Sequence, residues 1–297
     1  MTTFCHHTLK TCLLNASGCY STTKEQIDDL YQSEACSAIV SKSATLNWQQ
    51  GNDHPRLYID DQYCINNVGL SNFGLSYYNQ FVYKNENKLY IQSIYPQSVD
   101  NLKLLLLNTS SDTIEVNLSC PNVTTIDIHD YEIYFKAIHE YACDKTVGIK
   151  LPPLYHQYDF DTISEWLLKY EIDFITCCNT IPNCLLIDSQ HESTRIYPNN
   201  GLGGMSFKPL SLANVYQFYI RLGSNVDIIG CGGVYHGQDV FDYILCGATC
   251  VQIGSHLIKQ GVSCFEQINH ELMQLMKNKN YSHINEFRGQ LKLCSKL

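Results

Sequence analysis

The residues of this sequence best placed to do chemistry lie in one six-residue stretch, Asn117–Asn122. The residues just before it, Thr113–Val116, are rich in β-branched side chains and predict a short strand. Pro121 ends this strand, because proline has no N–H for the strand ladder and restricts the residue before it. The sequence therefore presents the Cys120 thiol and two carboxamides at the point where a strand meets a loop.

The thiol is the candidate for catalysis, although most cysteines in a chain with 15 of them are inert core residues. Cys120 differs because its neighbours are polar amides rather than apolar side chains. No Cys-x-x-Cys pair occurs, and we interpret His6 and His7 as part of a solvated turn. We therefore expect no metal site and no redox dithiol.

Composition excludes several classes of partner. The 297 residues carry a net charge of −9 and no block of Lys or Arg, which disfavours nucleic acid and anionic membranes. The longest aliphatic run, Leu104–Leu107, is far too short to cross a bilayer, and no signal-type apolar segment opens the sequence. The odd number and irregular spacing of the cysteines predict reduced thiols. We expect a cytoplasmic protein.

Apolar runs of strand length alternate with segments of helical period along the whole chain. Strands are predicted at residues 12–15, 38–41, 88–94, 114–120, 147–153, 173–179, 226–230 and 250–254. Helices are predicted at residues 23–32, 76–84, 99–107, 131–143, 161–170, 210–222, 238–245 and from the last strand to about residue 278. An excursion over residues 46–72 and a hairpin over residues 185–197 interrupt the alternation.

This order predicts an α/β fold: a single-domain (β/α)8 TIM barrel over residues 1–297, with hairpins inserted at its C-terminal rim. An open, doubly wound sheet is the alternative. The sequence disfavours it, because no Gly-x-Gly-x-x-Gly motif follows the first strand.

In such a barrel the active site forms at the carboxyl ends of the strands. Lys42 and Lys150 end strands that are otherwise apolar, and a buried lysine needs an anionic or strongly accepting partner. Gly232-Gly233 and Gly254-Ser255 follow the last two strands, where a TIM barrel usually binds phosphate. The other strand ends carry small or polar residues: Ala16, Ser17, Gly18, Ser43, Asn117, Asn122, Asn179 and Thr180.

One phosphate site, two inward lysines, several carboxamides and one thiol suit an enzyme that uses flavin mononucleotide (FMN). Lys150 at the pyrimidine edge of the flavin would stabilise negative charge on reduction. No His, Asp or Glu ends the first seven strands, so Cys120 is the predicted base. A planar, amide-rich substrate would bind the carboxamides of Asn66, Asn117, Asn122 and Asn179.

Several motifs occur in an order that matches a known family: Leu14–Gly18, Ser41–Leu46, Gly51-Asn52, Pro55-Arg56, Asn66, Gly69-Leu70, Asn72, Asn117–Asn122, Gly148–Pro153, Leu245–Thr249 and Gln252–Gly254. Over nearly its whole length the chain resembles the class 1A, fumarate-type dihydroorotate dehydrogenases. Cys120 is the most class-specific residue, since the membrane-associated class 2 enzymes have a serine there.

The resemblance implies a homodimeric flavoprotein that oxidises dihydroorotate to orotate in pyrimidine biosynthesis and is reoxidised by fumarate. Cys120 would take the proton from C5 while the C6 hydride passes to the flavin, and Lys42 would lie between flavin and substrate. Substrate contacts would come from Lys42, Asn66, Gly69, Leu70, Asn117, Asn122, Asn179 and Thr180. FMN contacts would come from Ala16, Ser17, Lys42, Ser43, Asn117, Lys150, Gly204, Gly232, Gly233, Gly254 and Ser255.

Four segments depart from the family pattern. Val123–Asp127 lacks the usual glycine, lysine and proline, and Tyr95-Pro96 replaces a small Ala-Gly pair, which predicts crowding on the flavin side. The run Gly201–Ser206 is shorter than usual and lacks a second glycine pair, and Thr176–Cys178 replaces more usual residues. Two alternatives therefore stay open: a relative that has lost turnover, with or without flavin, and an FMN barrel for another dihydropyrimidine.

Overall fold

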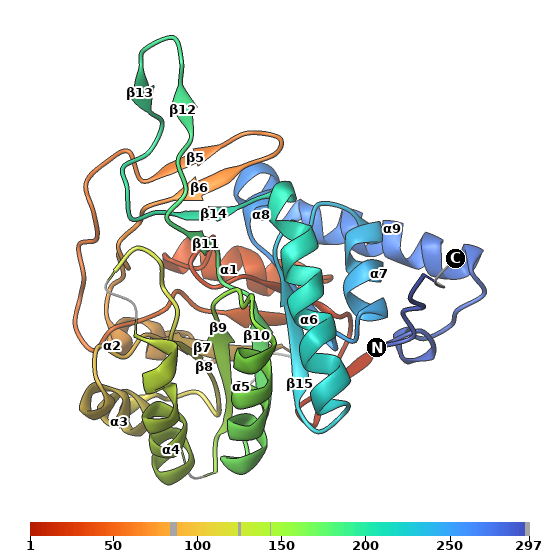
Figure 1. The fold of residues 1–297 in the computed structure, drawn as a ribbon. Helices are drawn as coiled ribbons and strands as arrows, with labels where there is room; N and C mark the ends of the chain where they lie inside the picture. The colour runs from red at the N-terminus through yellow and green to blue at the C-terminus, as the bar shows by residue number, and fades with distance from the viewer. Residues whose placement is uncertain (84–87, 124–125, 143, 295–297) are drawn as a thin grey trace.

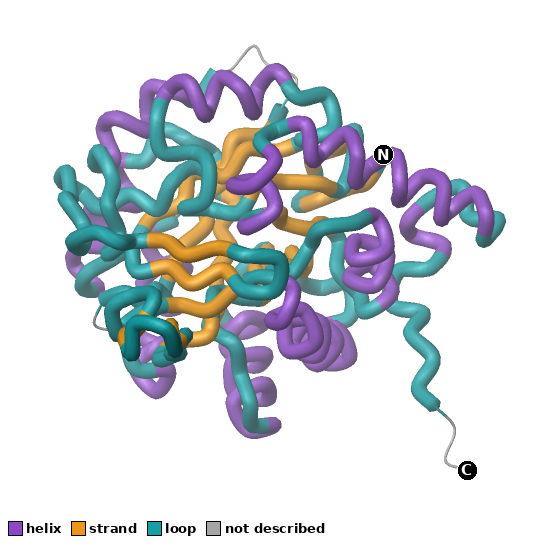
Figure 2. Tube along the Cα trace, turned by 90° about the horizontal axis from the view of Figure 1, so that it is seen from above, coloured by secondary structure: helices purple, strands orange, loops and turns teal. Residues whose placement is uncertain are grey.

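The computed structural model describes residues 1–83, 88–123, 126–142 and 144–294. Eight parallel strands close into a barrel in sequence order, and helices surround them (Figures 1 and 2). The barrel strands are β3 (Leu13–Asn15), β4 (Ala38–Val40), β7 (Leu89–Ile94), β8 (Thr113–Asn117), β9 (Thr146–Leu151), β10 (Phe174–Cys177), β15 (Asp227–Cys231) and β16 (Cys250–Ile253). The predicted TIM barrel is confirmed, and each of its eight predicted strands is present.

The helices agree with the prediction except at some ends. They are α1 (Lys24–Gln32), α2 (Leu75–Tyr78), α3 (Val99–Asn108), α4 (Tyr131–Tyr141), α5 (Gln157–Lys169), α6 (Lys208–Leu222), α7 (Gly237–Leu245), α8 (Ser255–Gln260) and α9 (Ser263–Asn278). The helix predicted to reach residue 84 is shorter, because α2 passes into the 3₁₀ turn Asn79–Phe81; residues 84 and 143 lie outside the described residues. The predicted last helix is broken at Gly261, whose φ of +67° glycine adopts without strain.

Strand β10 shows why these segments become barrel strands. All four of its residues are buried, since one face of a barrel strand packs on the helices while the other fills the barrel. The ring of Phe174 lies against Gly148 of β9, and a Cβ at Gly148 would overlap this ring. The Phe4 ring also contacts the Phe174 ring, with centroids 5.1 Å apart in a T-shaped arrangement. Close packing therefore fills this part of the barrel.

Phe4 belongs to an N-terminal hairpin that the sequence pattern did not predict, formed by β1 (Thr2–Phe4) and β2 (His7–Leu9). The solvated turn predicted at His6 and His7 is present, because both side chains are exposed where this hairpin reverses.

Two insertions stand at the carboxyl end of the barrel (Figure 1). The excursion over residues 46–72 contributes β5 (Leu57–Ile59) and β6 (Cys64–Asn66) to a four-stranded antiparallel sheet of order β11-β14-β6-β5, with β11 at Ile181–Pro182 and β14 at Gly201–Gly203. We call this the rim sheet. The predicted hairpin is confirmed and consists of β12 (Ile187–Asp188) and β13 (Ser193–Thr194). In the described part of the chain, no helix has the length and apolar character needed to span a membrane.

Candidate active site

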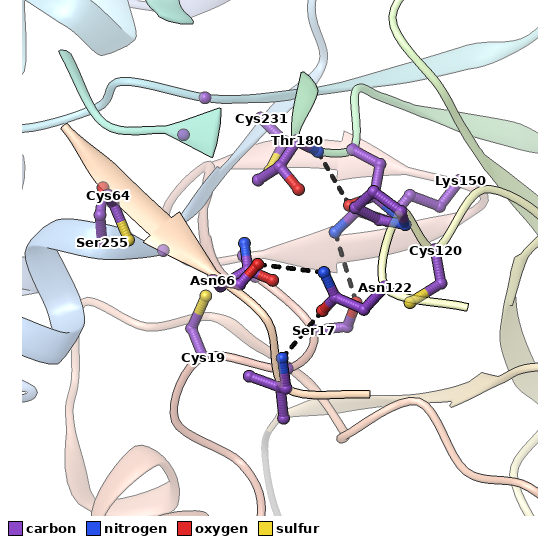
Figure 3. A pocket seen from close by; sticks show the side chains of 18 of the residues that line it. Ser17, Cys19, Cys64, Asn66, Cys120, Asn122, Lys150, Thr180, Cys231 and Ser255 are labelled. Carbon is purple, nitrogen blue, oxygen red and sulfur yellow. Dashed lines mark hydrogen bonds between the residues drawn. The ribbon is translucent and has the colours of Figure 1, made fainter. Parts of the chain in front are cut away.

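A cavity of about 300 Å³ opens at the carboxyl ends of the barrel strands, and residues of the rim sheet close part of it (Figure 3). The structure brings nearly all the predicted site residues together in its lining. These are Ala16, Ser17, Lys42, Ser43, Asn66, Leu70, Asn117, Cys120, Asn122, Lys150, Asn179, Thr180, Gly204, Gly232, Gly233, Gly254 and Ser255. Segments far apart in sequence thus meet at one rim, as parallel strands require.

Gly69 is the predicted site residue that does not line the cavity. Its φ is +67°, and a Cβ at this position would overlap the side chain of Asn52. The glycine therefore permits a tight turn packed against Asn52, and the next residue, Leu70, reaches the cavity instead.

Cys120 lies just beyond the end of β8 and is only 7% exposed. Its side chain packs in a small apolar cluster with Leu70 and Tyr95, against which Val123 also lies. Burial raises the pKa of the Cys120 thiol, while a hydrogen bond from the Asn122 backbone and the charges of both cavity lysines act in the opposite direction. The thiol form is therefore favoured in this structure, and the lysines supply the field that a thiolate needs.

The two lysines have different surroundings. Lys150 Nζ donates to Ser17 Oγ at 3.3 Å and to Gln252 Oε1 at 3.2 Å. Burial disfavours the Lys150 ammonium, but the Cys231 sulfur and the Glu115 carboxylate favour it, and the net effect raises its pKa. Lys150 is therefore held as a cation inside the barrel.

Lys42 Nζ donates to Gly18 O at 3.5 Å, a long contact for an ammonium that is 6% exposed. Burial lowers the pKa of Lys42; the Cys120 and Cys19 sulfurs oppose this effect, and the charges of Lys150 and Arg56 add to it. A buried ammonium with so little hydrogen bonding fits a ligand that brings an acceptor or a negative charge.

The asparagines form two pairs. Asn117 Oδ1 accepts from Asn179 Nδ2 at 3.2 Å, which joins the ends of β8 and β10 at the cavity floor. Asn122 holds the rim: its Oδ1 accepts from Val68 N and its Nδ2 donates to Asn66 O, both at 3.0 Å (Figure 3). The first pair faces the barrel, and the second fastens the loop after β8 to the rim sheet.

Glycines allow the backbone to come close at the opposite end of the cavity. Gly204, Gly232 and Gly233 have φ values of +90°, +138° and +65°. A Cβ at Gly233 would lie 2.9 Å from Gly204 O, so only glycine lets these two segments approach. Such a cradle leaves backbone groups accessible to a phosphate, as predicted for this end of the cavity.

Two side chains at this end are already engaged. Lys208 Nζ contacts Asp239 Oδ1 and Asp242 Oδ2, each at 2.6 Å, and Ser255 Oγ lies 3.0 Å from Tyr235 Oη. Backbone N–H groups are therefore better placed than Lys208 to bind a phosphate. Among the residues described, no group of three or more His, Cys, Asp or Glu side chains could hold a metal ion.

Sequence reasoning missed several residues of the cavity lining. Cys231 ends β15 and Cys178 follows β10, so the rule of strand ends could have found both. Leu57 and Cys64 come from the rim sheet, whose place over the barrel no local pattern reveals. Tyr95 is outside this lining and packs against Cys120, and its predicted crowding of the flavin side stays a prediction.

Fold and site together define a TIM-barrel protein whose cavity combines a buried thiol, two lysines and a glycine cradle. The family model of dihydroorotate dehydrogenase matches residues 1–276. Dihydroorotate dehydrogenase (fumarate) of Kluyveromyces lactis is 39% identical over 310 aligned positions, and dihydroorotate dehydrogenase A (fumarate) of Lactococcus lactis is 38% identical over 308; each alignment covers 98% of both chains. The chain therefore belongs to the dihydroorotate dehydrogenase family, and the resemblance to its fumarate-type members is confirmed.

A solved structure supports the fold independently. The ligand-free DHODH of Eimeria tenella superposes with a TM-score of 0.80 at 19% sequence identity, covering 94% of this chain and 88% of that one. At 19% sequence identity, this structural match shows a shared fold and nothing about function.

Proposed function

We propose that this protein uses FMN to oxidise dihydroorotate to orotate in pyrimidine biosynthesis and that fumarate reoxidises the flavin. The observation that carries the proposal is the meeting of Cys120, Lys42 and Lys150 in one cavity, in a chain of the dihydroorotate dehydrogenase family. The carboxamides near the thiol suit a planar substrate with amide groups. Retention of these groups favours a working enzyme over a relative without turnover.

The cavity fits FMN at two places. The glycine cradle would hold the phosphate, and Lys150 would face the flavin ring beside Ala16 and Ser17. The weakly bonded Lys42 ammonium would gain an acceptor from cofactor or substrate. FMN, when bound, supplies the acceptor for the hydrogen and electron pair that leave C6 of the substrate.

Cys120 is the proposed base for the C5 proton. It acts in the thiolate form, which Lys42 and Lys150 favour and burial opposes. As the S–H bond forms, the C5–H bond breaks, and the electron pair becomes part of the new C5–C6 double bond of orotate. A positioned base typically contributes about 10²–10⁴-fold to the rate.

Water must be kept from the thiolate during this step. Leu70, Tyr95 and Val123 pack around the Cys120 side chain, and Asn122 ties the following loop to β6. These contacts supply a closed, largely apolar surrounding on the protein side, in which the charges of both lysines act strongly.

The test is anaerobic reduction of the purified holoprotein. We expect a yellow protein whose flavin absorbance is bleached by dihydroorotate with formation of one orotate per flavin, and whose colour returns on addition of fumarate. A colourless protein that cannot be reconstituted with FMN would contradict the proposal. Bleaching by dihydrouracil but not by dihydroorotate would support the alternative dihydropyrimidine enzyme.

We also propose that the protein works as a cytoplasmic homodimer. The rim carries exposed apolar side chains, Leu185 and Ile187 on the projecting hairpin and Tyr197 beside it, each more than half exposed. Burying such a surface against a second copy would stabilise the pair. Sedimentation equilibrium should give twice the chain mass, and a monomer at micromolar concentration would contradict this part of the proposal.

A further inference from the structure

Glu115 is a fully buried carboxylate inside the barrel, two residues before Asn117 on β8. Its Oε2 accepts hydrogen bonds from Thr176 Oγ1 and Gln252 Nε2, both at 2.8 Å, and its Oε1 accepts from Ser93 Oγ at 3.4 Å. The donors stand on three other strands: β10, β16 and β7. Burying a charge is strongly unfavourable unless the charge is compensated, so packing alone does not explain a carboxylate at this position.

One connection runs from Glu115 to Lys150 through Gln252. The Gln252 amide lies between an acceptor-only carboxylate and a donor-only ammonium, with its Oε1 3.2 Å from Lys150 Nζ. Only one orientation of the amide satisfies both neighbours, because a flipped amide would point its NH₂ at the ammonium and its oxygen at the carboxylate. Glu115 therefore determines which atom of Gln252 meets Lys150.

A second connection runs from Glu115 to Asn117. Ser93 donates to the carboxylate, so its oxygen is free to accept from Ser43 Oγ, 2.9 Å away. Ser43 in turn accepts from Asn117 Nδ2 at 3.2 Å. Since the chain of bonds ends on an acceptor-only group, every donor in it points toward Glu115, and Asn117 Oδ1 is left to accept from Asn179 Nδ2 and from the Ser119 backbone N–H.

We propose that Glu115 is a positioning residue for the active site: it sets the hydrogen-bond direction of both connections and places a buried counter-charge one amide away from the Lys150 ammonium. The cofactor side and the substrate side of the cavity are thereby oriented from one buried charge. The inference rests on the proposed function, because Lys150 and Asn117 matter for catalysis only if they face FMN and dihydroorotate.

The protonation of Lys150 depends on every group that faces it. The charged or titratable groups around its ammonium are Cys231 on β15, Glu115 on β8, Cys19 after β3, Cys178 after β10, Lys42 after β4 and Cys120 after β8. Burial raises the pKa of each of these thiols, that of Cys231 to about 11, so the neutral thiol forms are favoured at neutral pH. Glu115 is the carboxylate in this set, and Thr176, Gln252 and Ser93 donate hydrogen bonds to it.

The test compares holoprotein variants that keep size but change charge or connection. Glu115→Gln removes the charge, Gln252→Met cuts the link to Lys150, and Thr176→Val is the matched control, since it removes a bond to the same carboxylate but leaves both connections in place. Midpoint potentials are measured by dye-coupled reduction of the bound flavin. We expect Glu115→Gln and Gln252→Met to weaken binding of reduced relative to oxidised FMN by about tenfold, which is about 30 mV toward negative potential for a two-electron couple. Thr176→Val should stay near the wild type.

A second measurement does not need the cofactor. In the wild-type apoprotein, the Lys150 Nζ resonance, assigned with Lys150→Met, should titrate above the ordinary range of a lysine, and in Glu115→Gln it should titrate lower. A wild-type value below the ordinary range would overturn the inference even if no variant folds. Potentials and titrations equal to wild type in the folded variants would also overturn it. If the wild-type protein does not bind FMN, the proposed function fails, while the Lys150 titration still decides the role of Glu115.

Discussion

The floor and the rim of the cavity are built differently. On the floor, Lys150, Gln252 and Glu115 are joined by hydrogen bonds within the protein and are almost fully buried. Toward the rim, Lys42 makes one long contact to a carbonyl, and the Cys120 thiol packs against apolar side chains. The floor is thus organised without a ligand, whereas the rim holds groups that gain partners when a ligand enters.

The pKa values of the two lysines express this difference. Both are buried, yet the pKa of Lys150 is raised and that of Lys42 is lowered. Burial acts in the same direction on both, so the opposite outcomes come from their neighbours. The Cys231 sulfur and the Glu115 carboxylate offset burial at Lys150, whereas the Cys120 and Cys19 sulfurs do not offset it at Lys42, where the charges of Lys150 and Arg56 also lower the pKa. A preorganised floor fits a resident cofactor, and an unsatisfied cation at the rim fits a substrate that comes and goes.

The largest effect is expected at the rim, from removal of the base. Cys120→Ala should lower the rate of flavin reduction by dihydroorotate by about 10²–10⁴-fold and leave orotate and FMN binding intact, because the thiol acts on the proton and not on affinity. Stopped-flow reduction and orotate titration measure the two effects. Cys64→Ala, which also removes a thiol from the lining, is the matched control. Unchanged reduction by Cys120→Ala would remove this residue from the mechanism.

The direction in which the rate of flavin reduction changes with pH tests whether Cys120 acts as a base. Because burial raises the pKa of Cys120, the thiolate fraction and the reduction rate should increase as pH rises toward that value. Cys120→Ser should move this rise to higher pH, since a hydroxyl is the weaker acid. A rate that falls with pH over this range would argue for an acid instead of a base.

Below the cavity the barrel should resist any added volume. Gly148→Ala would push a methyl group into the Phe174 ring and should lower the free energy of unfolding by about 1–3 kcal/mol, measured in urea. Phe174→Leu alone should also destabilise, but the double variant should be more stable than the sum of both losses, because the smaller side chain makes room. Additive losses of unfolding free energy would mean that the barrel relaxes around position 148. The interior below the cavity would then be less rigid than the comparison of floor and rim implies.

A change of charge at the rim should act on ligand binding. Lys42→Met removes a charge-assisted hydrogen bond to the incoming anion and should weaken orotate binding by about tenfold. In the wild type, affinity should fall as pH rises through the lowered pKa of Lys42, because the neutral amine no longer attracts the anion; the variant should lack this fall. Lys208→Met is the control, since Asp239 and Asp242 already neutralise Lys208. If Lys42→Met and Lys208→Met showed the same fall of orotate affinity with pH, the fall would belong to a titrating group other than Lys42.

How much of this the sequence could reveal depends on the range of the interactions. The eight strands and most helices follow from local periodicity, and the positions of Lys42, Cys120 and Lys150 follow from the rule that sites form at strand ends. Their proposed roles stay predictions. Glu115 could not be predicted as a site residue, because its hydrogen-bond donors stand on three other strands and no local sequence pattern brings these strands together. The contact of Tyr95 with Cys120 is also long-range, because a residue after β7 can face either the cavity or the loop after β8.

The smallest effect is expected farthest from the floor, on the projecting hairpin. Asp188 Oδ2 lies 3.1 Å from His191 Nδ1 and forms an ion pair with Arg195 at 3.3 Å, and both partners are solvent-exposed. Ion pairs of this kind contribute little, so Asp188→Asn should change turnover by no more than about twofold. Steady-state turnover and sedimentation of the variant, compared with wild type, check this. A large loss of turnover with an intact dimer would mean that the hairpin takes part in the reaction. The comparison of floor and rim would then have to include the hairpin as a third functional region.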